Sequence, residues 1–392
     1  MPHRPELASL SEGQVLEPVE LTVAEAAGLN STGLVTAQPA SGGWRVVAEH
    51  RIGAVTCGAL SVRVRPKVGA VQVLRLLARA HGVDGLRISD RLTDVEATGA
   101  VEPDLNSVLA VLFAQEAAGA LAAGPLRGYR TQDQTAAVVR GRIRLREQEL
   151  RRFGAPVPIE ITVDEWTTDT VENRRIRAAT RRLLTVPGLP RHVVVRLRRV
   201  DHGLADVRLG PRGAPISAWQ PTRLNARLHR LLTLTDLVLD RIGIEHRVGD
   251  VDVHGYSLSM AWLFEQLVTR VLTDAGLGVQ SQPSYPLDDD GLLTIQPDLV
   301  FLRGGAAVGV ADVKYKRLDK PGAVPNADVY QLVTYCRRLG LETGHLIYAA
   351  DHPSFPLCLS QVGVTIWVHS VDLSATVDVI EARIVGAVAA AV

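Results

Sequence analysis

The stretch 292–316, LLTIQPDLVFLRGGAAVGVADVKYK, is the part of the 392-residue sequence that most directly indicates a fold. Runs rich in Val, Leu and Ile flank Arg303-Gly304-Gly305, a turn signal. This pattern predicts two neighbouring strands, over 292–301 and 307–316, joined by a tight turn.

Acidic and basic residues interrupt these apolar runs. Side chains two apart on a strand project from the same face, so Asp312 and Lys314 should point together, with Val313 and Tyr315 on the opposite face. Asp298 lies on the neighbouring strand. We therefore expect two carboxylates and an ammonium group to converge on one face of a sheet, in a pocket suited to Mg²⁺, which prefers oxygen ligands.

The residues around this stretch complete an α/β unit in the order α-β-β-β-α-β-β-α. The segment 251–392 is therefore expected to be one α/β domain. The expected elements are a helix over 257–275, strands over 280–287, 292–301 and 307–316, a helix over 328–339, strands over 344–350 and 364–369, and a helix over 373–388.

The preceding residues divide into two further expected domains, giving a multi-domain α/β protein. Residues 1–124 should form a β-rich domain and residues 125–250 a basic α/β region with a linker helix. The expected elements are a strand pair over 44–65, helices over 71–81 and 106–123, strands over 162–166 and 193–197, and helices over 170–185 and 224–242.

Composition excludes several classes of protein. With 46% hydrophobic and 22% charged residues, the chain has an ordinary globular composition, and it lacks the roughly 18 consecutive apolar residues of a membrane helix. The amino terminus has no secretory signal pattern, so we expect a cytoplasmic protein. The three cysteines form no CxxC pair, which argues against a disulfide framework or a thiolate zinc site.

Charge is concentrated in the middle of the chain. Residues 125–213 contain 19 basic and 10 acidic residues, although the whole chain has a net charge of only +1. A polyanionic partner such as DNA and an ordinary solvated surface both fit this excess. If DNA binds here, Arg174, Arg177 and Arg181, on one side of the helix expected over 170–185, should contact its phosphates.

Lysine is rare, yet it clusters. Only four of the 43 basic residues are lysines, and Lys314, Lys316 and Lys320 fall within seven residues. An ammonium group is a compact charge that a guanidinium does not replace, so the cluster indicates chemistry. We expect Lys314 to be catalytic and Lys316 to bind DNA.

Two neighbouring helices add candidate residues. Glu265 stands among apolar residues on the helix expected over 257–275, where a lone carboxylate would be costly to bury. Gln331 and Tyr335 are four apart, and thus on one face of their helix. D-x-K alone is more typical of a surface ion pair, and these additional residues together with the lysine cluster favour a catalytic site.

Together these residues resemble the PD-(D/E)xK nucleases, through Pro297-Asp298 and Asp312-x-Lys314, and the expected element order also matches that fold. The resemblance implies that Asp298, Asp312 and the Val313 carbonyl hold Mg²⁺, that Lys314 orients the attacking water, and that Glu265 completes the outer shell of the metal. Gln331 and Tyr335 would flank this site.

The resemblance extends to the McrC subunits of 5-methylcytosine restriction systems, through Val64-Arg65-Pro66-Lys67-Val68-Gly69, Arg140-Gly141-Arg142-Ile143, Glu172-Asn173-Arg174 and the nuclease motif. It implies a Mg²⁺-dependent DNA endonuclease that acts with an AAA+ GTPase. Lys67 is our candidate for contact with that partner. The sequence itself contains no G-x-x-x-x-G-K-[ST] loop, so we expect this chain to bind no nucleotide.

Two other functions are open at this point. The chain could be a stand-alone DNA repair nuclease of the Q-x-x-x-Y type, or a non-catalytic adaptor built on a nuclease fold. The presence of Asp298, Asp312 and Lys314 argues against the adaptor.

Overall fold

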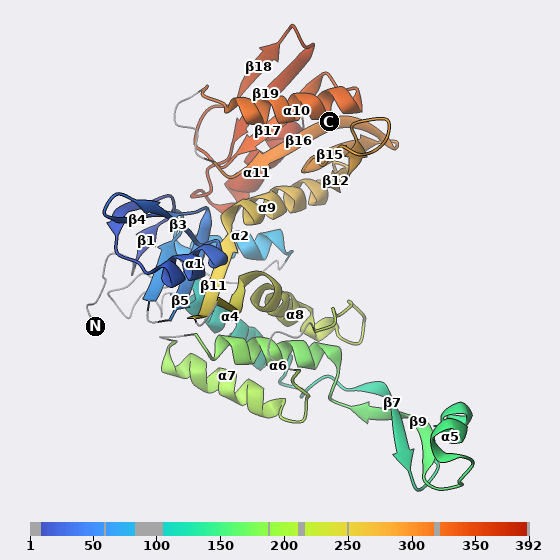
Figure 1. Ribbon diagram of the computed structural model, residues 1–392. Coiled ribbons are helices and arrows are strands. Elements are labelled where there is room, and N and C mark those ends of the chain that lie inside the picture. The colour runs from blue at the N-terminus through green and yellow to red at the C-terminus, as the bar shows by residue number, and fades with distance from the viewer. Residues whose placement is uncertain are drawn as a thin grey trace. The chain divides into compact units, whose positions relative to one another are not determined.

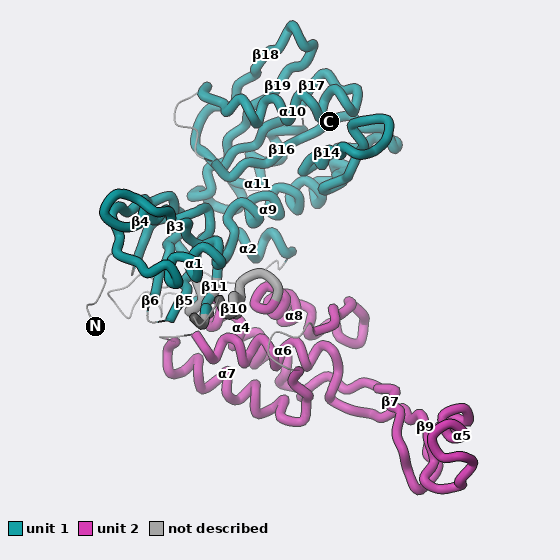
Figure 2. Tube along the Cα trace, in the orientation of Figure 1, with its two compact units in different colours: residues 1–108, 244–392 teal, residues 109–243 magenta. Residues whose placement is uncertain are grey.

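The computed structural model describes residues 9–58, 60–82, 105–186, 189–210, 216–248, 251–316 and 322–389. The chain forms two compact units, one of residues 1–108 with 244–392 and one of residues 109–243 (Figure 2). Several sheets and helices make up a mixed α/β fold, which confirms the predicted class. No helix in the described part of the chain is both long and apolar enough to cross a membrane.

The β-rich beginning of the first unit contains two sheets. One has the order β2-β4-β3, and helix α1 packs beside it. Helix α1 starts at Thr22, which forms a capping box with Glu25, and ends at Gly33, whose φ of 64° suits glycine. The bounds are β2 Val15–Val19, α1 Val23–Thr32, β3 Val35–Ala40 and β4 Gly43–Ala48.

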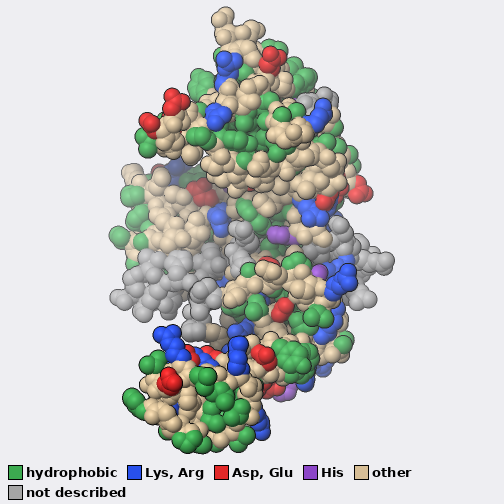
Figure 3. All heavy atoms as spheres, turned by 90° about the vertical axis from the view of Figure 1, so that its right-hand side faces the viewer, with side chains coloured by type: hydrophobic (Ala, Val, Ile, Leu, Met, Phe, Trp, Pro, Cys, Tyr) green, Lys and Arg blue, Asp and Glu red, His purple; other side chains and the backbone are tan. Residues whose placement is uncertain are grey.

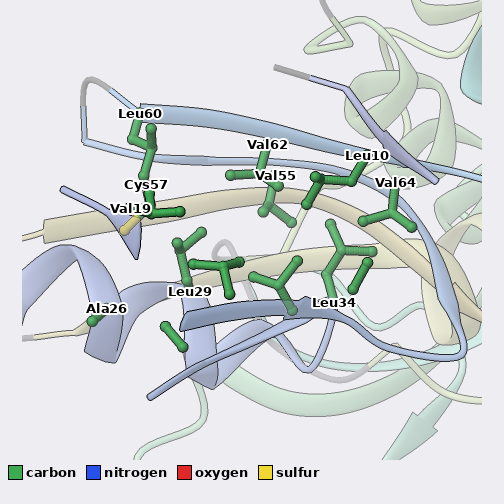
Figure 4. Close-up of a cluster of buried hydrophobic side chains, with 14 of the residues drawn as sticks. Leu10, Val19, Ala26, Leu29, Leu34, Val55, Cys57, Leu60, Val62 and Val64 are labelled. Carbon is green, nitrogen blue, oxygen red and sulfur yellow. The ribbon is translucent and has the colours of Figure 1, made fainter. Parts of the chain in front are cut away.

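The second sheet has the order β1-β6-β5-β11-β10 and joins segments that are far apart in the sequence. Strand β11 pairs antiparallel with β5, so a strand stands at 257–259, where the sequence predicted helix. Its apolar side chains share one core with the β2-β4-β3 sheet (Figure 4). The bounds are β1 Leu10–Ser11, β5 Arg51–Cys57, β6 Leu60–Arg65, β10 Gly243–Val248 and β11 Val251–Ser259.

The sequence predicts domain boundaries near 124, where an expected helix ends, and near 250, where the pattern changes to an α/β unit. The compact units instead group the two ends of the sequence, because β10 and β11 return to the sheet that contains β5. Helices α2 (Ala70–Ala80) and α4 (Leu105–Ala120) lie where the sequence predicts helices over 71–81 and 106–123. The three consecutive domains stay a prediction.

A six-stranded sheet in the order β12-β15-β16-β17-β19-β18 dominates the rest of the first unit (Figure 1). Strands β16, β17 and β19 are parallel, and the edge pairs are antiparallel. Helix α10 covers one face, while α9 and α11 pack on the other. The bounds are α9 Met260–Asp274, β12 Val279–Ser281, β15 Leu299–Arg303, β16 Ala306–Lys314, α10 Asn326–Leu339, β17 Thr343–Tyr348, β18 Phe355–Leu359, β19 Val364–Ser370 and α11 Val377–Val388.

Local chemistry explains how this sheet differs from the prediction. The strand expected over 292–301 is split into β14 (Thr294–Ile295) and β15, because Pro297 has no N–H to give to a ladder. The strand expected over 280–287 is likewise split, into β12 and β13 (Tyr285–Pro286), at Gln282, whose φ is 48°. Both interruptions lie beside the candidate site.

The second unit combines a helical part with a projecting β-sheet. Strand β9 pairs with both β7 and β8, and this sheet with helix α5 forms a projection of residues 128–167, here called the arm (Figure 1). The bounds are β7 Gly128–Ala136, β8 Arg142–Ile143, α5 Leu145–Arg152, β9 Ile159–Thr167, α6 Val171–Leu183, α7 Arg191–Gly203 and α8 His229–Asp236.

Two predictions in this unit are wrong. The strand expected over 193–197 is part of helix α7, in which Val193, Leu197 and Val200 are buried at helical spacing. The single helix expected over 224–242 is divided into a 3₁₀ turn, α8 and a π-helical segment at Leu237–Ile242.

Candidate active site

The two carboxylates and the lysine predicted to converge do lie together. Asp312 and Lys314 are on β16, opposite Leu346 and Tyr348 of β17, and therefore share the α10 face of the sheet. Asp298, immediately before β15, accepts a hydrogen bond at 2.8 Å from the backbone N–H of Val313. This bond holds the first carboxylate against the strand that carries the second.

Asp312 is a buried carboxylate, with 1% of its surface exposed. Its Oδ2 lies 2.6 Å from Lys314 Nζ, yet it accepts no well-directed hydrogen bond from the described residues. Burial, and then the charge of Asp298, raises the pKa of Asp312 to about 7. Burial lowers the pKa of Lys314, but the contact with Asp312 and the charges of Asp312, Asp298 and Asp328 together outweigh this and leave that pKa raised.

Glu265 approaches the same site from α9. Its Oε1 accepts a hydrogen bond at 2.6 Å from Gln282 Nε2. Burial, and then the charge of Asp298, raises the pKa of Glu265. Gln282 itself is fixed, since its backbone N–H donates to Asp298 O at 2.9 Å and its carbonyl accepts from Gln296 Nε2 at 3.1 Å. The sequence did not single out Gln282. Its only signal there is its place in the strand expected over 280–287, which does not indicate a functional role.

Gln331 and Tyr335 hold the lysine from α10. Lys314 Nζ donates to Gln331 Oε1 at 3.1 Å, and Gln331 Nε2 contacts Tyr335 OH at 2.6 Å. Tyr335 OH in turn donates to Gln296 O at 3.3 Å. Helix α10 can lie this close to the sheet because Gly344 of β17 has no side chain, and an added Cβ would sit 2.7 Å from Cys336 Sγ. Hydrogen bonds, an ion pair and electrostatic interactions therefore link all six predicted catalytic residues.

Lys316 occupies a neighbouring cluster. Its half-exposed Nζ donates to Asp328 Oδ1 at 2.8 Å, and Tyr348 OH donates to Asp328 Oδ2, also at 2.8 Å. Asp328 is buried in the first turn of α10, and sequence reasoning did not single it out. DNA contact by Lys316 stays a prediction.

The middle-segment arginines are engaged within their own unit. Arg174 makes two hydrogen bonds of 2.6 Å to Asp169, and these hold the pKa of that buried carboxyl at about 2. Arg177, with 12% of its side chain exposed, and Arg181, with 54%, share Asp201. DNA contact by these arginines stays a prediction, and only Arg181 is exposed enough to reach a phosphate without breaking a buried ion pair.

The carboxylates of Asp298 and Asp312 supply oxygen ligands of the kind that Mg²⁺ prefers. The buried Asp312 Oδ2 contacts Lys314 Nζ at 2.6 Å and accepts no well-directed hydrogen bond from the described residues, which suits it to a hard cation. Across the described part of the chain, no three His, Cys, Asp or Glu side chains are grouped closely enough to bind a metal. Two carboxylates leave positions for water and phosphate oxygens, which Mg²⁺ commonly retains.

The sequence profile of the family described as McrBC 5-methylcytosine restriction system component matches residues 46–349. This match covers β5 and β6, the second unit and the segment with Asp298, Asp312 and Lys314. The chain belongs to the McrBC family. No curated protein matches the sequence.

Two solved structures resemble this McrBC-family chain. One is a half-complex from a tetradecameric assembly of Thermococcus gammatolerans McrB AAA+ hexamers with bound McrC, with 17% identity, a TM-score of 0.60, and coverage of 98% of this chain and 99% of that one. The other is the Thermococcus gammatolerans McrBC complex, with 19% identity, a TM-score of 0.43, and coverage of 68% and 87%. The first likeness shows that the two chains share a fold along nearly their whole length.

Proposed function

We propose that this McrBC-family chain is the Mg²⁺-dependent DNA endonuclease subunit of a modification-dependent restriction system, with a PD-(D/E)xK nuclease domain. The observation that carries the proposal is the convergence of Asp298, Asp312 and Lys314 on one sheet face, where the buried Asp312 carboxylate lies 2.6 Å from the Lys314 ammonium group. Hydrolysis of a phosphodiester requires stabilisation of negative charge on the phosphate, and a metal beside an ammonium group provides it.

Each residue then has a defined role. Asp298, Asp312 and the Val313 carbonyl would hold Mg²⁺, which when bound polarises the phosphate and lowers the pKa of attacking water. Lys314 orients that water and offsets charge on the phosphate. Gln331 supports this role because it accepts a hydrogen bond from Lys314 and limits the positions of the ammonium group. Glu265 would complete the outer shell of the metal.

We propose that the chain acts with an AAA+ GTPase. The support is the family match and the nearly complete structural overlap with an McrC that is bound to McrB AAA+ hexamers. Lys67, the candidate contact, is exposed in the turn between β6 and α2, close to Gly13. Nucleotide would be bound by the partner and not by this chain.

The arm supplies a second candidate surface for that partner. Contiguous apolar surface on a soluble protein marks an interaction site, and the arm displays apolar side chains among arginines (Figure 3). Tyr129 and Trp166 pack against each other across β7 and β9, with ring centroids 4.8 Å apart and ring planes tilted by 55°, and Phe153 is 93% exposed. Aromatic and arginine side chains are the groups that protein interfaces favour.

The test is reconstitution of the complete system. The purified chain and its AAA+ partner should together cleave plasmid containing 5-methylcytosine, in the presence of Mg²⁺ and GTP, and leave unmethylated plasmid intact. Replacement of Asp312 with Asn should abolish cleavage without loss of the complex. An inactive complex with a fully folded chain would contradict the proposal.

One observation favours a different nuclease. Gln331 and Tyr335 contact each other at the lysine, as expected for a stand-alone repair enzyme of the Q-x-x-x-Y type. Efficient cleavage by the isolated chain without nucleotide would support that function instead. Normal activity in variants of Asp298 or Lys314 would leave the non-catalytic adaptor as the remaining candidate.

A further inference from the structure

Tyr315, the residue after the candidate catalytic lysine, connects the active-site strand to the beginning of the chain. Its hydroxyl donates a hydrogen bond at 3.1 Å to Glu12 Oε2, across a sequence separation of 303 residues within the same compact unit. Its ring centroid lies 5.8 Å from that of His50 and 6.5 Å from that of Phe264 of α9. The tyrosine therefore lies between α9 and the N-terminal sheets.

Glu12 is held firmly at this junction. Its side chain is fully buried. Its backbone N–H donates to Arg65 O of β6, and the next residue, Gly13, donates to Ala48 O of β4, both at 3.1 Å. The backbone around Glu12 thus belongs to both N-terminal sheets, and the carboxylate has a fixed position from which to accept the Tyr315 bond.

Packing alone does not require a carboxylate at this position. Glu12 Oε1 accepts no hydrogen bond from any described residue and faces His50 Nδ1 at 3.5 Å. A buried carboxylate with so few partners is costly, and an apolar side chain of similar size is often at least as stable. The unfavourable choice of residue indicates a role other than stability.

A second contact ties α9 to the same place. The backbone N–H of Met260, the first residue of α9, donates to His50 O at 3.0 Å. Helix α9 carries Glu265, and Tyr315 directly follows β16, which carries Lys314. The N-terminal sheets therefore anchor both the helix that carries Glu265 and the end of the strand that carries Lys314.

We propose that Glu12 is a positioning residue for DNA cleavage, an inference that rests on the nuclease function proposed above. By accepting the Tyr315 hydrogen bond, Glu12 fixes the end of β16 and so the reach of Lys314 toward Asp312. Glu12 does not touch the substrate. Its effect passes through Tyr315 alone.

The experiment uses the complex with the AAA+ partner and compares Tyr315→Phe, Glu12→Leu and the double variant. Each single variant should lower kcat for plasmid cleavage about tenfold, the size expected for loss of a buried hydrogen bond to a charged group, with KM for DNA unchanged. The double variant should lose no more than either single variant, because both break one contact. Glu12→Gln keeps the acceptor and should restore most activity.

Two readouts separate positioning from general stability. Glu12→Leu should unfold at the wild-type temperature or higher, although it cleaves poorly. In the metal-free chain, amide exchange in a peptide covering 306–316 should be about tenfold faster in Tyr315→Phe, as for loss of a comparable hydrogen bond. Glu49→Gln is the matched control, since Glu49 accepts a 2.5 Å bond from Thr36 within the N-terminal sheets and should leave both readouts unchanged.

The outcomes distinguish this inference from the proposed function. Normal cleavage by Lys314→Ala would refute the nuclease assignment and the inference with it. Loss of cleavage in Lys314→Ala, together with wild-type kcat in Tyr315→Phe and Glu12→Leu, would refute the inference only. A roughly hundredfold loss in the double variant would also refute it, because the two residues would then act independently.

Discussion

Replacement of Asp312 with Asn should stabilise the metal-free protein at alkaline pH. In the folded chain, burial and the charge of Asp298 raise the pKa of this carboxyl from its usual 3.8 to about 7. The folded state then binds a proton more tightly than the unfolded state, so stability falls as pH rises from about 4 through about 7 and stays low above that. Asn is neutral at every pH and avoids this loss.

The magnitude follows from the shift. At about 1.36 kcal/mol per pKa unit, the change from 3.8 to about 7 corresponds to about 4 kcal/mol above pH 7. The substitution also removes the partner 2.6 Å from Lys314, which offsets part of the gain. We expect the unfolding free energy of Asp312→Asn to exceed that of the wild type by about 2 kcal/mol at pH 8 and to match it or fall below it at pH 4.

Urea unfolding in EDTA, at pH values from 4 to 8, measures this difference directly. Mg²⁺ added at pH 8 should stabilise the wild type and leave Asp312→Asn unchanged, because binding to the folded state alone adds stability. An Asn variant that is less stable than the wild type at pH 8, or that gains equally from Mg²⁺, would contradict the description of a strained carboxylate pair built to hold a cation.

Three further predictions concern separate parts of the chain. Asp298→Ala and Lys314→Ala should abolish plasmid cleavage while the circular dichroism spectrum is retained, and Lys314→Arg should fail too because a guanidinium does not fit a site for an ammonium group. Arg181→Gln should reduce the salt dependence of DNA binding by about one unit of log–log slope, and an unchanged slope would return this arginine to a purely structural role. Burial holds the pKa of both His345 and His369 at about 4, below the usual 6.5, so the stability that this pair contributes is lost as pH falls from 6.5 through 4. Acid unfolding of His369→Phe should lack the part of this component that His369 contributes, while the part from the buried His345 remains, and an unchanged acid profile would show that His369 does not titrate as described.

Local patterns were sufficient to predict the candidate active site. Strand alternation placed Asp312 with Lys314, and helical spacing placed Gln331 with Tyr335, since both are properties of a single element. The mixed α/β class was confirmed for the same reason, because most helices and strands of the C-terminal region have clear apolar periodicity. The contacts among these elements agree with the predicted convergence.

Non-local contacts explain what the sequence did not show. Residues 193–197 are rich in valine, a strand former, and yet they lie in α7, because tertiary packing of its buried side chains overrides a weak intrinsic preference. Strand β18 was missed because Pro356 weakens its strand signal, and it forms as the edge partner of β19, a position that tolerates proline. The pairing of β11 with β5 joins residues about 200 positions apart, which no local pattern encodes.

Non-local contacts also explain why the arginines of the middle segment differ from the prediction. A helix that displays arginines on one side predicts a basic surface, but Arg177 donates to Asp201 and to the carbonyls of Ala205 and Val207. These acceptors lie 24 to 30 residues away in the sequence. An excess of arginine in composition therefore does not measure the charge that is available to DNA.

The most direct test of the central claim is cleavage of 5-methylcytosine-containing plasmid by the complex of this chain with its AAA+ partner, measured for the wild type and Lys314→Ala with Mg²⁺ and GTP. The wild-type complex should convert supercoiled plasmid to cut products, and the Lys314→Ala complex should assemble equally well and leave the plasmid intact. Equal cleavage by both complexes would contradict the assignment of the active site.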